Sequence, residues 1–205
     1  MFVRAAEESG AIVELGAWAI EEACRQGARW RARGAGFVVS VNVSNRQLEQ
    51  GDIRETVERA LGMSGLDPTA LMLEVRESAL VAGEDVAVAL QGLRTMGVGL
   101  AIDDFGAGLS SMNALRGFPV DWLKIDGGFL HGSLGAQDVA LLEALVRLGR
   151  SLGLETVAEG IETSEQRACA QYVGFDSGQG YQLRRPSSVR DIDLMVEHQR
   201  WESLL

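Results

Sequence analysis

The chain has 205 residues, of which 46% are hydrophobic, so it can bury one substantial core, and it carries no low-complexity tract. Its formal net charge of −10 at pH 7 argues against a protein that wraps a nucleic-acid duplex, because such proteins need a basic face. No apolar run approaches the roughly 18 residues of a membrane helix, and the N-terminal MFVRAAEESG lacks the layout of a signal peptide. We therefore expect a cytoplasmic protein without a membrane segment.

Short β-branched runs alternate with amphipathic stretches along the chain. Six runs predict strands, the last of them weakly: 37–43, 70–77, 98–104, 120–126, 154–160 and 175–181. Apolar residues at helical spacing, such as Ile12, Leu15 and Trp18, predict helices between nearly all of them. Five glycines lie between a helix and the next strand, where a left-handed cap is easiest: Gly34, Gly65, Gly97, Gly153 and Gly174. Strands that alternate with helices predict a parallel sheet covered by helices, an α/β fold.

Polar side chains lie at or just after the ends of these predicted strands: Asn42, Glu74, Asp103, Asp104, Lys124, Asp126, Glu159 and Gln179. A barrel of parallel strands brings all such ends to one rim, where barrels of this kind carry out chemistry. A doubly wound sheet would bring together only the central two or three. The pattern therefore favours a TIM-type (β/α) barrel.

Asp103 and Asp104 are adjacent carboxylates that repel each other unless cations lie among them. Their oxygens suit hard divalent ions, Mg²⁺ or Mn²⁺, and further ligands would complete the shells: Asn42, Glu74 and Glu159. Both aspartates can serve one site only where the strand has ended and the backbone turns. A two-metal site about 3.5–4 Å across orders a water and stabilises the leaving oxygen of a phosphodiester, and Lys124 would orient that water or offset the phosphoryl charge.

Each of these signals also has a simpler interpretation. An Asp-Asp pair before glycine is commonly a strand end and turn, Asn42 is a possible turn former, and Lys124 with Asp126 is a possible solvated salt bridge. Only their coincidence at successive strand ends favours a metal site. The two cysteines, Cys24 and Cys169, lack metal or redox spacing and are predicted to be plain buried thiols.

Six ordered segments resemble the signature motifs of the EAL-domain family of cyclic-di-GMP phosphodiesterases. They are SVNVSNRQL (40–48), LEVRES (73–78), AIDDFGAGLSSM (101–112), FPVDWLKID (118–126), TVAEGIET (156–163) and GQGY (178–181). The resemblance implies a (β/α)₈ barrel that hydrolyses cyclic di-GMP to linear pGpG with two Mg²⁺ or Mn²⁺ ions, and Ca²⁺ is then expected to inhibit. It also implies a role in bacterial signalling, with fused or partner signalling domains.

Residue roles follow from motif position. The resemblance implies that one metal is held by Asn42, Glu74 and Asp103, and the other by Asp103, Asp104 and Glu159. It implies catalytic roles for Lys124, which matches the lysine that holds the water, for Asp104, and for Glu159 as candidate base. Three further residues match substrate or loop positions: Gln179, Glu77, which would anchor the loop after Asp104, and Asp126. That loop, near Gly106–Ser111, is tied to dimerisation in the family, so we expect a homodimer.

The chain also departs from the family pattern. It has no Glu-Ala-Leu segment, and its opening FVRAAEESG aligns with a stretch that normally follows the first two strands. We therefore expect a single barrel domain over residues 1–205 with about six of the eight strands, whose open edges a second copy or upstream sequence would cover. A glutamate ligand and a phosphate-binding arginine are missing with those strands, which weakens one metal position. The activity of this chain alone is therefore open.

Local departures are of three kinds. Arg76 stands where threonine is usual, and Gly127 with Gly128 is expected to loosen a rim loop. Arg184 and Arg185 replace part of a Phe-Gly-containing turn, where they are either solvated surface or a partial substitute for the lost positive charge.

Two alternatives from other classes remain. One is a noncatalytic EAL module that binds cyclic di-GMP or a protein partner, favoured by the missing ligand. The other is a barrel enzyme that uses Lys124 as a Schiff-base amine and Glu159 as proton carrier, which leaves the Asp-Asp pair unexplained.

Overall fold

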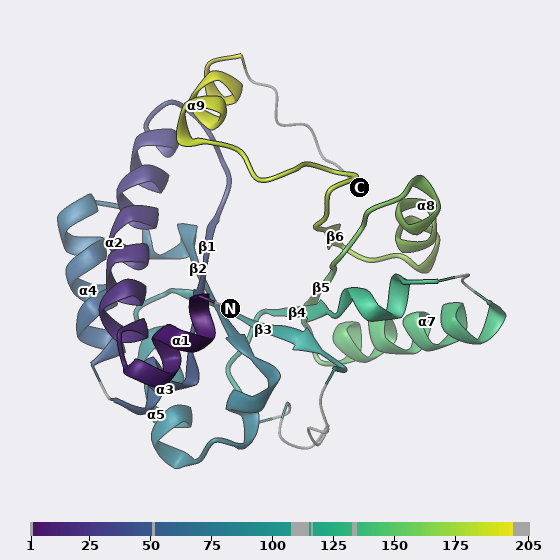
Figure 1. Cartoon of the computed structure of the whole chain (residues 1–205), viewed down its shortest axis with the longest axis horizontal. Coiled ribbons are helices and arrows are strands. Elements are labelled where there is room, and N and C mark those ends of the chain that lie inside the picture. The colour runs from purple at the N-terminus through teal and green to yellow at the C-terminus, as the bar shows by residue number, and fades with distance from the viewer. Residues whose placement is uncertain (1, 51, 108–114, 116, 133–134, 199–205) are drawn as a thin grey trace. The chain divides into compact units, whose positions relative to one another are not determined.

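The computed structural model describes residues 2–50, 52–107, 115, 117–132 and 135–198. Six strands follow one another in the sheet order β1-β2-β3-β4-β5-β6 (Figure 1). Their bounds are β1 Val39–Val43, β2 Leu71–Arg76, β3 Gly99–Phe105, β4 Trp122–Ile125, β5 Glu155–Ala158 and β6 Ser177–Gly178. The pairs β1/β2, β4/β5 and β5/β6 are parallel. All six predicted strands are therefore present, and the α/β class is confirmed.

Helices follow nearly every strand. The α-helices are α1 Phe2–Ser9, α2 Ile12–Arg31, α3 Asn45–Glu49, α4 Ile53–Ser64, α5 Glu84–Thr95, α7 Ala136–Ser151, α8 Ser164–Val173 and α9 Val189–Glu197. Three short 3₁₀ helices are η1 Pro68–Ala70, η2 Glu77–Val81 and η3 Gly127–Leu130. In the described part of the chain, no helix is both long and apolar enough to cross a membrane.

The chain divides into two compact units, which are described separately. The first comprises Met1–Ala101 and Ser110–Pro119. In it, α2 packs against both α4 and β1 (Figure 1). Side chains alternate along β1, where Val41 and Val43 are buried while Ser40 and Asn42 are exposed. One face of the strand therefore builds the core, and the other carries polar groups.

The second unit comprises Ile102–Leu109 and Val120–Leu205. Helix α7 packs on β4, β5 and α8 (Figure 1). Leu123 and Ile125 of β4 and Leu142 and Val146 of α7 are buried, so the helix and the strand share one apolar layer. This layer supports the strand ends that carry the polar side chains.

Helix ends match their sequence signals closely. All five predicted cap glycines have positive φ, between +67° at Gly65 and +88° at Gly97. Thr163 and Gln166 form a capping box at the start of α8. The same Ser/Thr pattern occurs at Ser44 before α3 and at Ser188 before α9, where it also forms capping boxes.

Exposure differs from the sequence pattern at one tryptophan and one cysteine. Trp18 lies on the apolar stripe of α2 by spacing, yet it is 61% exposed, because it lies at the rim of the α2–α4 contact beside Met63. Cys24 is a buried thiol as predicted, whereas Cys169 is only half-buried, since α8 lies at the surface. Helical spacing identifies the apolar stripe but not where a neighbouring element ends.

Candidate active site

Three carboxylates and one lysine converge in the second unit. Asp103 and Asp104 lie near the end of β3, Lys124 lies on β4, and Glu159 follows β5 directly. One oxygen from each carboxylate lies within 4.8 Å of the other two. Lys124 Nζ lies 2.6 Å from Asp103 Oδ1 and 2.8 Å from Glu159 Oε1. The predicted convergence of these four side chains is therefore present in this unit.

An unusual backbone conformation positions Asp104. Its φ is +55°, and among the described residues it is the one non-glycine residue with positive φ. A left-handed L-residue costs about 1–2 kcal/mol, although aspartate tolerates it better than most. The backbone turn expected between the two aspartates is thus made at Asp104 itself, although the strand continues to Phe105.

Hydrogen bonds between strands fix the Glu159 segment. The Glu159 N–H donates to the Ile125 carbonyl at 3.2 Å, at the end of β4. The Gln179 N–H donates to the Ala158 carbonyl at 2.8 Å, which places the segment after β6 beside Glu159. Glu159 and Gln179 are therefore both held by backbone hydrogen bonds, and the Glu159 side chain also pairs with Lys124.

Burial of Lys124 and Glu159 raises the free-energy cost of keeping charges in this cluster. Desolvation raises the pKa of Glu159 to about 7; the Lys124 hydrogen bond opposes the rise, and the charges of Asp103 and Asp104 add to it. Lys124 itself is 3% exposed. Three ionised carboxylates and one ammonium carry a formal charge of −3 + 1 = −2, which a divalent cation would balance. The oxygen donor set therefore fits a hard divalent ion.

Two more predicted residues have identifiable local roles. Asp126 Oδ1 accepts a hydrogen bond from the Gly128 N–H at 2.8 Å and so caps η3, directly after Lys124 and Ile125. The expectation of a loosened loop at Gly127 is wrong. A Cβ at Gly127 would lie 3.0 Å from Gly160 Cα and 3.2 Å from the Glu159 carbonyl, so the missing side chain allows close backbone packing.

The first unit holds the other predicted ligands. Asn42 and Glu74 are register partners on the parallel strands β1 and β2, so their side chains lie on the same face. Glu74 is buried, and the Ser40 hydroxyl donates a hydrogen bond to its Oε1. Glu77 is buried at the start of η2. Sequence reasoning missed Ser40, although its position two residues before Asn42 places it on the same strand face.

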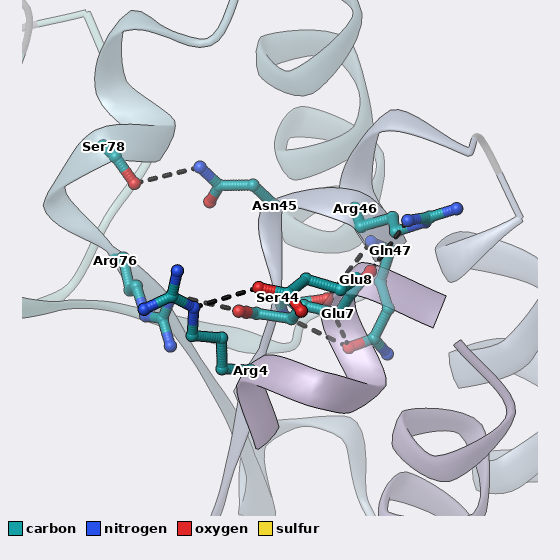
Figure 2. A network of polar contacts seen from close by, with 9 residues as sticks. All are labelled: Arg4, Glu7, Glu8, Ser44, Asn45, Arg46, Gln47, Arg76 and Ser78. Carbon is teal, nitrogen blue, oxygen red and sulfur yellow. Dashed lines mark hydrogen bonds and ion pairs between the residues drawn. The ribbon is translucent and has the colours of Figure 1, made fainter. Parts of the chain in front are cut away.

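A polar network lies beside these residues (Figure 2). Arg76 Nη1 lies 3.3 Å from Glu7 Oε1 of α1, and Arg46 Nη1 donates to the Glu7 carbonyl at 2.7 Å. Asn45 Nδ2 donates to Ser78 Oγ at 2.9 Å. The departure at Arg76 thus has a local partner in α1. In the loop expected to mediate dimerisation, near Gly106–Ser111, residues 108–111 lie outside the described residues.

Comparison with known proteins identifies the same family. The model of the EAL domain matches residues 1–186. The bifunctional diguanylate cyclase/cyclic di-GMP phosphodiesterase MucR of Pseudomonas aeruginosa is 42% identical over 194 residues, which cover 93% of this chain and 28% of MucR. The cyclic di-GMP phosphodiesterase PdeR of Escherichia coli is 33% identical over 98% of this chain and 30% of its own length. The chain therefore spans under a third of these curated relatives.

The structure of this chain also resembles solved structures of proteins with an EAL domain. The P. aeruginosa MucR phosphodiesterase in complex with c-di-GMP matches with a TM-score of 0.88 and 39% identity, over 93% of this chain and 78% of that one. The EAL domain of Mycobacterium smegmatis DcpA matches with a TM-score of 0.83 and 35% identity, over 92% of this chain and 86% of that one. The predicted fold class, an α/β fold of the TIM-barrel type, is confirmed by its likeness to these neighbours, of which this chain covers 78% and 86%.

Proposed function

The chain belongs to the EAL domain family, and from this premise we propose that it is a cyclic-di-GMP phosphodiesterase that hydrolyses cyclic di-GMP to linear pGpG. The observation that carries the proposal is the cluster of Asp103, Asp104 and Glu159 around Lys124, with ligand oxygens within 4.8 Å of one another. A site for a structural cation alone would not need a buried lysine among its carboxylates.

The carboxylates would hold the metal ions. Asp103, Asp104 and Glu159 offer oxygens to one ion, and Asn42 and Glu74 are proposed as ligands of a second. Mg²⁺ and Mn²⁺ fit this oxygen donor set, and Ca²⁺ is expected to inhibit. When bound, such a pair of ions generates the nucleophile from water and stabilises charge on the phosphodiester.

The chain's own residues would handle the protons and the phosphate. Glu159 is the candidate base that would accept a proton from the attacking water, and a bound cation would favour its ionised form over the metal-free protein, where burial raises its pKa to about 7. Lys124 keeps the carboxylates in position and can donate a hydrogen bond to the water or the phosphoryl oxygen. Ion pairs to two carboxylates already engage its amine, which disfavours the Schiff-base alternative.

Three residues are proposed to support the site from its edge. Gln179 would contact the substrate, Asp126 would fix the turn after Lys124, and Glu77 would anchor the loop after Asp104. A cytoplasmic location, a homodimer and partner signalling domains complete the proposal as expectations that follow from the family.

The test measures pGpG by chromatography after cyclic di-GMP is incubated with Mg²⁺ or Mn²⁺. We expect metal-dependent product, its loss in Glu159→Gln, and a loss of at least about 100-fold in Lys124→Met. Arg147→Met is the matched control, because Arg147 forms an exposed ion pair with Glu143 at 3.7 Å. Saturable nucleotide binding without any hydrolysis would instead select the noncatalytic module.

A further inference from the structure

A concave site of about 320 Å³ lies beyond the end of β6, entirely within the second unit. Gln179, Tyr181, Arg184 and Arg185 supply most of its polar lining, and Ile192 of α9 contributes an apolar side chain. None of the described residues that line it is acidic. In a chain with a net charge of −10, two guanidinium groups thus share one pocket.

Within the described part of the chain the direct side-chain contacts of the two arginines are uncharged, although the charge of Arg184 adds to the Ser188 hydrogen bonds and to Arg190 in lowering the pKa of Asp191. Arg184 Nη1 donates to Met195 Sδ at 2.6 Å, and sulfur is only a weak acceptor. The Arg185 guanidinium lies 4.6 Å from the centre of the Tyr181 ring. The nearby carboxylate of Asp191 is engaged by the Ser188 hydroxyl at 2.7 Å. The pocket therefore offers several guanidinium N–H donors to an anion.

The ring of Tyr181 orders one of these donors. A guanidinium stacked on an aromatic face keeps its N–H groups in the plane, directed outward, while the ring restricts its rotation. Tyr181 is itself 52% exposed, so part of the ring is open to a ligand. An aromatic surface beside paired arginines suits a phosphorylated nucleoside, because bases stack on aromatic rings and phosphates match the guanidinium fork.

The backbone connects this pocket to the carboxylate cluster. The Ile161 N–H donates to the Gln179 carbonyl at 3.0 Å, and Ile161 is two residues after Glu159. A Cβ at Gly180 would lie 2.1 Å from the Ile161 carbonyl oxygen, so the two segments pack without space between them. Gln179 therefore borders both the pocket and the segment that carries Glu159.

We propose that this pocket is a second phosphate subsite, in which Arg184 and Arg185 bind the phosphodiester of the cyclic dinucleotide that is not cleaved while Tyr181 contacts the adjoining base. The identity of the dinucleotide rests on the proposed function. The anion-binding property of the pocket rests on its own residues. Arg184 and Arg185 thus act on substrate binding rather than on the reacting phosphate.

The first experiment measures the affinity of the full chain for cyclic di-GMP by calorimetry, once with EDTA and once with Ca²⁺. We expect Arg184→Ala and Arg185→Ala each to weaken binding at least tenfold. Arg185→Lys should lie between wild type and Arg185→Ala, because lysine keeps the charge but not the planar fork. Arg190→Ala removes the same charge from an exposed position of α9 outside the pocket, and it should weaken binding less than threefold.

The second experiment separates the pocket from the chemistry. In steady-state hydrolysis of cyclic di-GMP, the losses in Arg184→Ala and Arg185→Ala should fall on KM rather than on kcat. If no hydrolysis occurs at all, the proposed phosphodiesterase function fails, and the calorimetry still decides the pocket. The subsite is overturned if wild type binds no cyclic di-GMP under either condition, or if both variants bind as Arg190→Ala does.

Discussion

Lys124 Nζ lies between Asp103 Oδ1 and Glu159 Oε1, and the whole residue is 3% exposed. Burial of charged groups costs several kcal/mol for each ion, and their mutual attraction offsets this cost only when the charges are well paired. One ammonium cannot neutralise three carboxylates. Burial is the main reason that the pKa of Glu159 rises to about 7, and the charges of Asp103 and Asp104 add to the rise, so the metal-free cluster favours a protonated Glu159.

This imbalance predicts how the stability of the metal-free protein depends on pH. The pKa of Glu159 is about 7 when folded and near 4.5 when unfolded, so between these values the folded state binds the extra proton. The free energy of unfolding therefore falls as pH rises from 4.5 to 7, by a contribution of up to about 3 kcal/mol. Urea unfolding in EDTA, at pH 4.5 to 8, measures it.

Glu159→Gln is the comparison for that series, because glutamine keeps the shape and cannot ionise. The variant should gain stability relative to wild type as the pH rises through the window. A difference between the two proteins that stays constant from pH 4.5 to 8 would show that Glu159 does not carry this pH dependence.

The positive φ of Asp104, +55°, leads to a separate prediction about stability. Asp104→Ala and Asp104→Gly both remove the carboxylate, yet glycine adopts a left-handed conformation without strain. We expect the glycine variant to be more stable than the alanine variant by about 1 kcal/mol in thermal or urea unfolding. Gly62 is exposed in the last turn of α4 and has a helical conformation, so Gly62→Ala should stabilise the protein, because alanine is the better helix former. Equal stability of the two Asp104 variants would contradict a strained turn.

Side chains with local signals could be predicted, and those with distant partners could not. Asp103, Asp104, Lys124 and Glu159 stand at strand ends that the sequence marks by β-branched runs and glycine. The stacking of Arg185 on Tyr181 has no comparable signal, because side-chain direction in an irregular turn depends on the folded backbone. This is why sequence reasoning left the role of the two arginines open.

At the level of elements, the turn after β6 depends on close packing. A Cβ at Gly180 would lie 2.1 Å from the Ile161 oxygen and 2.4 Å from the Ile161 nitrogen. Gly180→Ala must therefore break the Ile161–Gln179 hydrogen bond, and it should destabilise the protein by about 1–3 kcal/mol and weaken cyclic di-GMP binding. Gly36→Ala is the control, since nothing lies within 4 Å of its Cβ position. Unchanged urea midpoints in both variants would contradict the packing.

The strands were predictable as elements, although their lengths were not. The weakest run, 175–181, yields only the two-residue strand β6, because glycine and serine add little apolar burial. The helix caps followed from glycine and Ser/Thr signals that act within four residues. The burial of helix faces was less predictable, as exposed Trp18 shows, because it depends on where a neighbouring helix ends.

At the level of the whole molecule, the excess of acidic residues causes two kinds of repulsion, one spread over the chain and one within the carboxylate cluster. A net charge of −10 produces diffuse repulsion that any salt screens. The cluster of Asp103, Asp104 and Glu159 adds a local repulsion that Lys124 offsets in part and that a bound cation would relieve further. A comparison of NaCl with MgCl₂ at equal ionic strength separates the two effects.

Both salts should raise the melting temperature of wild type, and Mg²⁺ should raise it further. Its binding adds about 2.7 kcal/mol to the free energy of unfolding at a hundredfold excess over its Kd. Asp103→Asn removes a ligand and should respond equally to both salts. Glu58→Gln removes the same charge from an exposed position of α4 and should keep the Mg²⁺ increment, which differential scanning fluorimetry can follow. If Asp103→Asn retains the full increment, Mg²⁺ stabilises the protein through its general charge, and the carboxylate cluster is not the site where it binds.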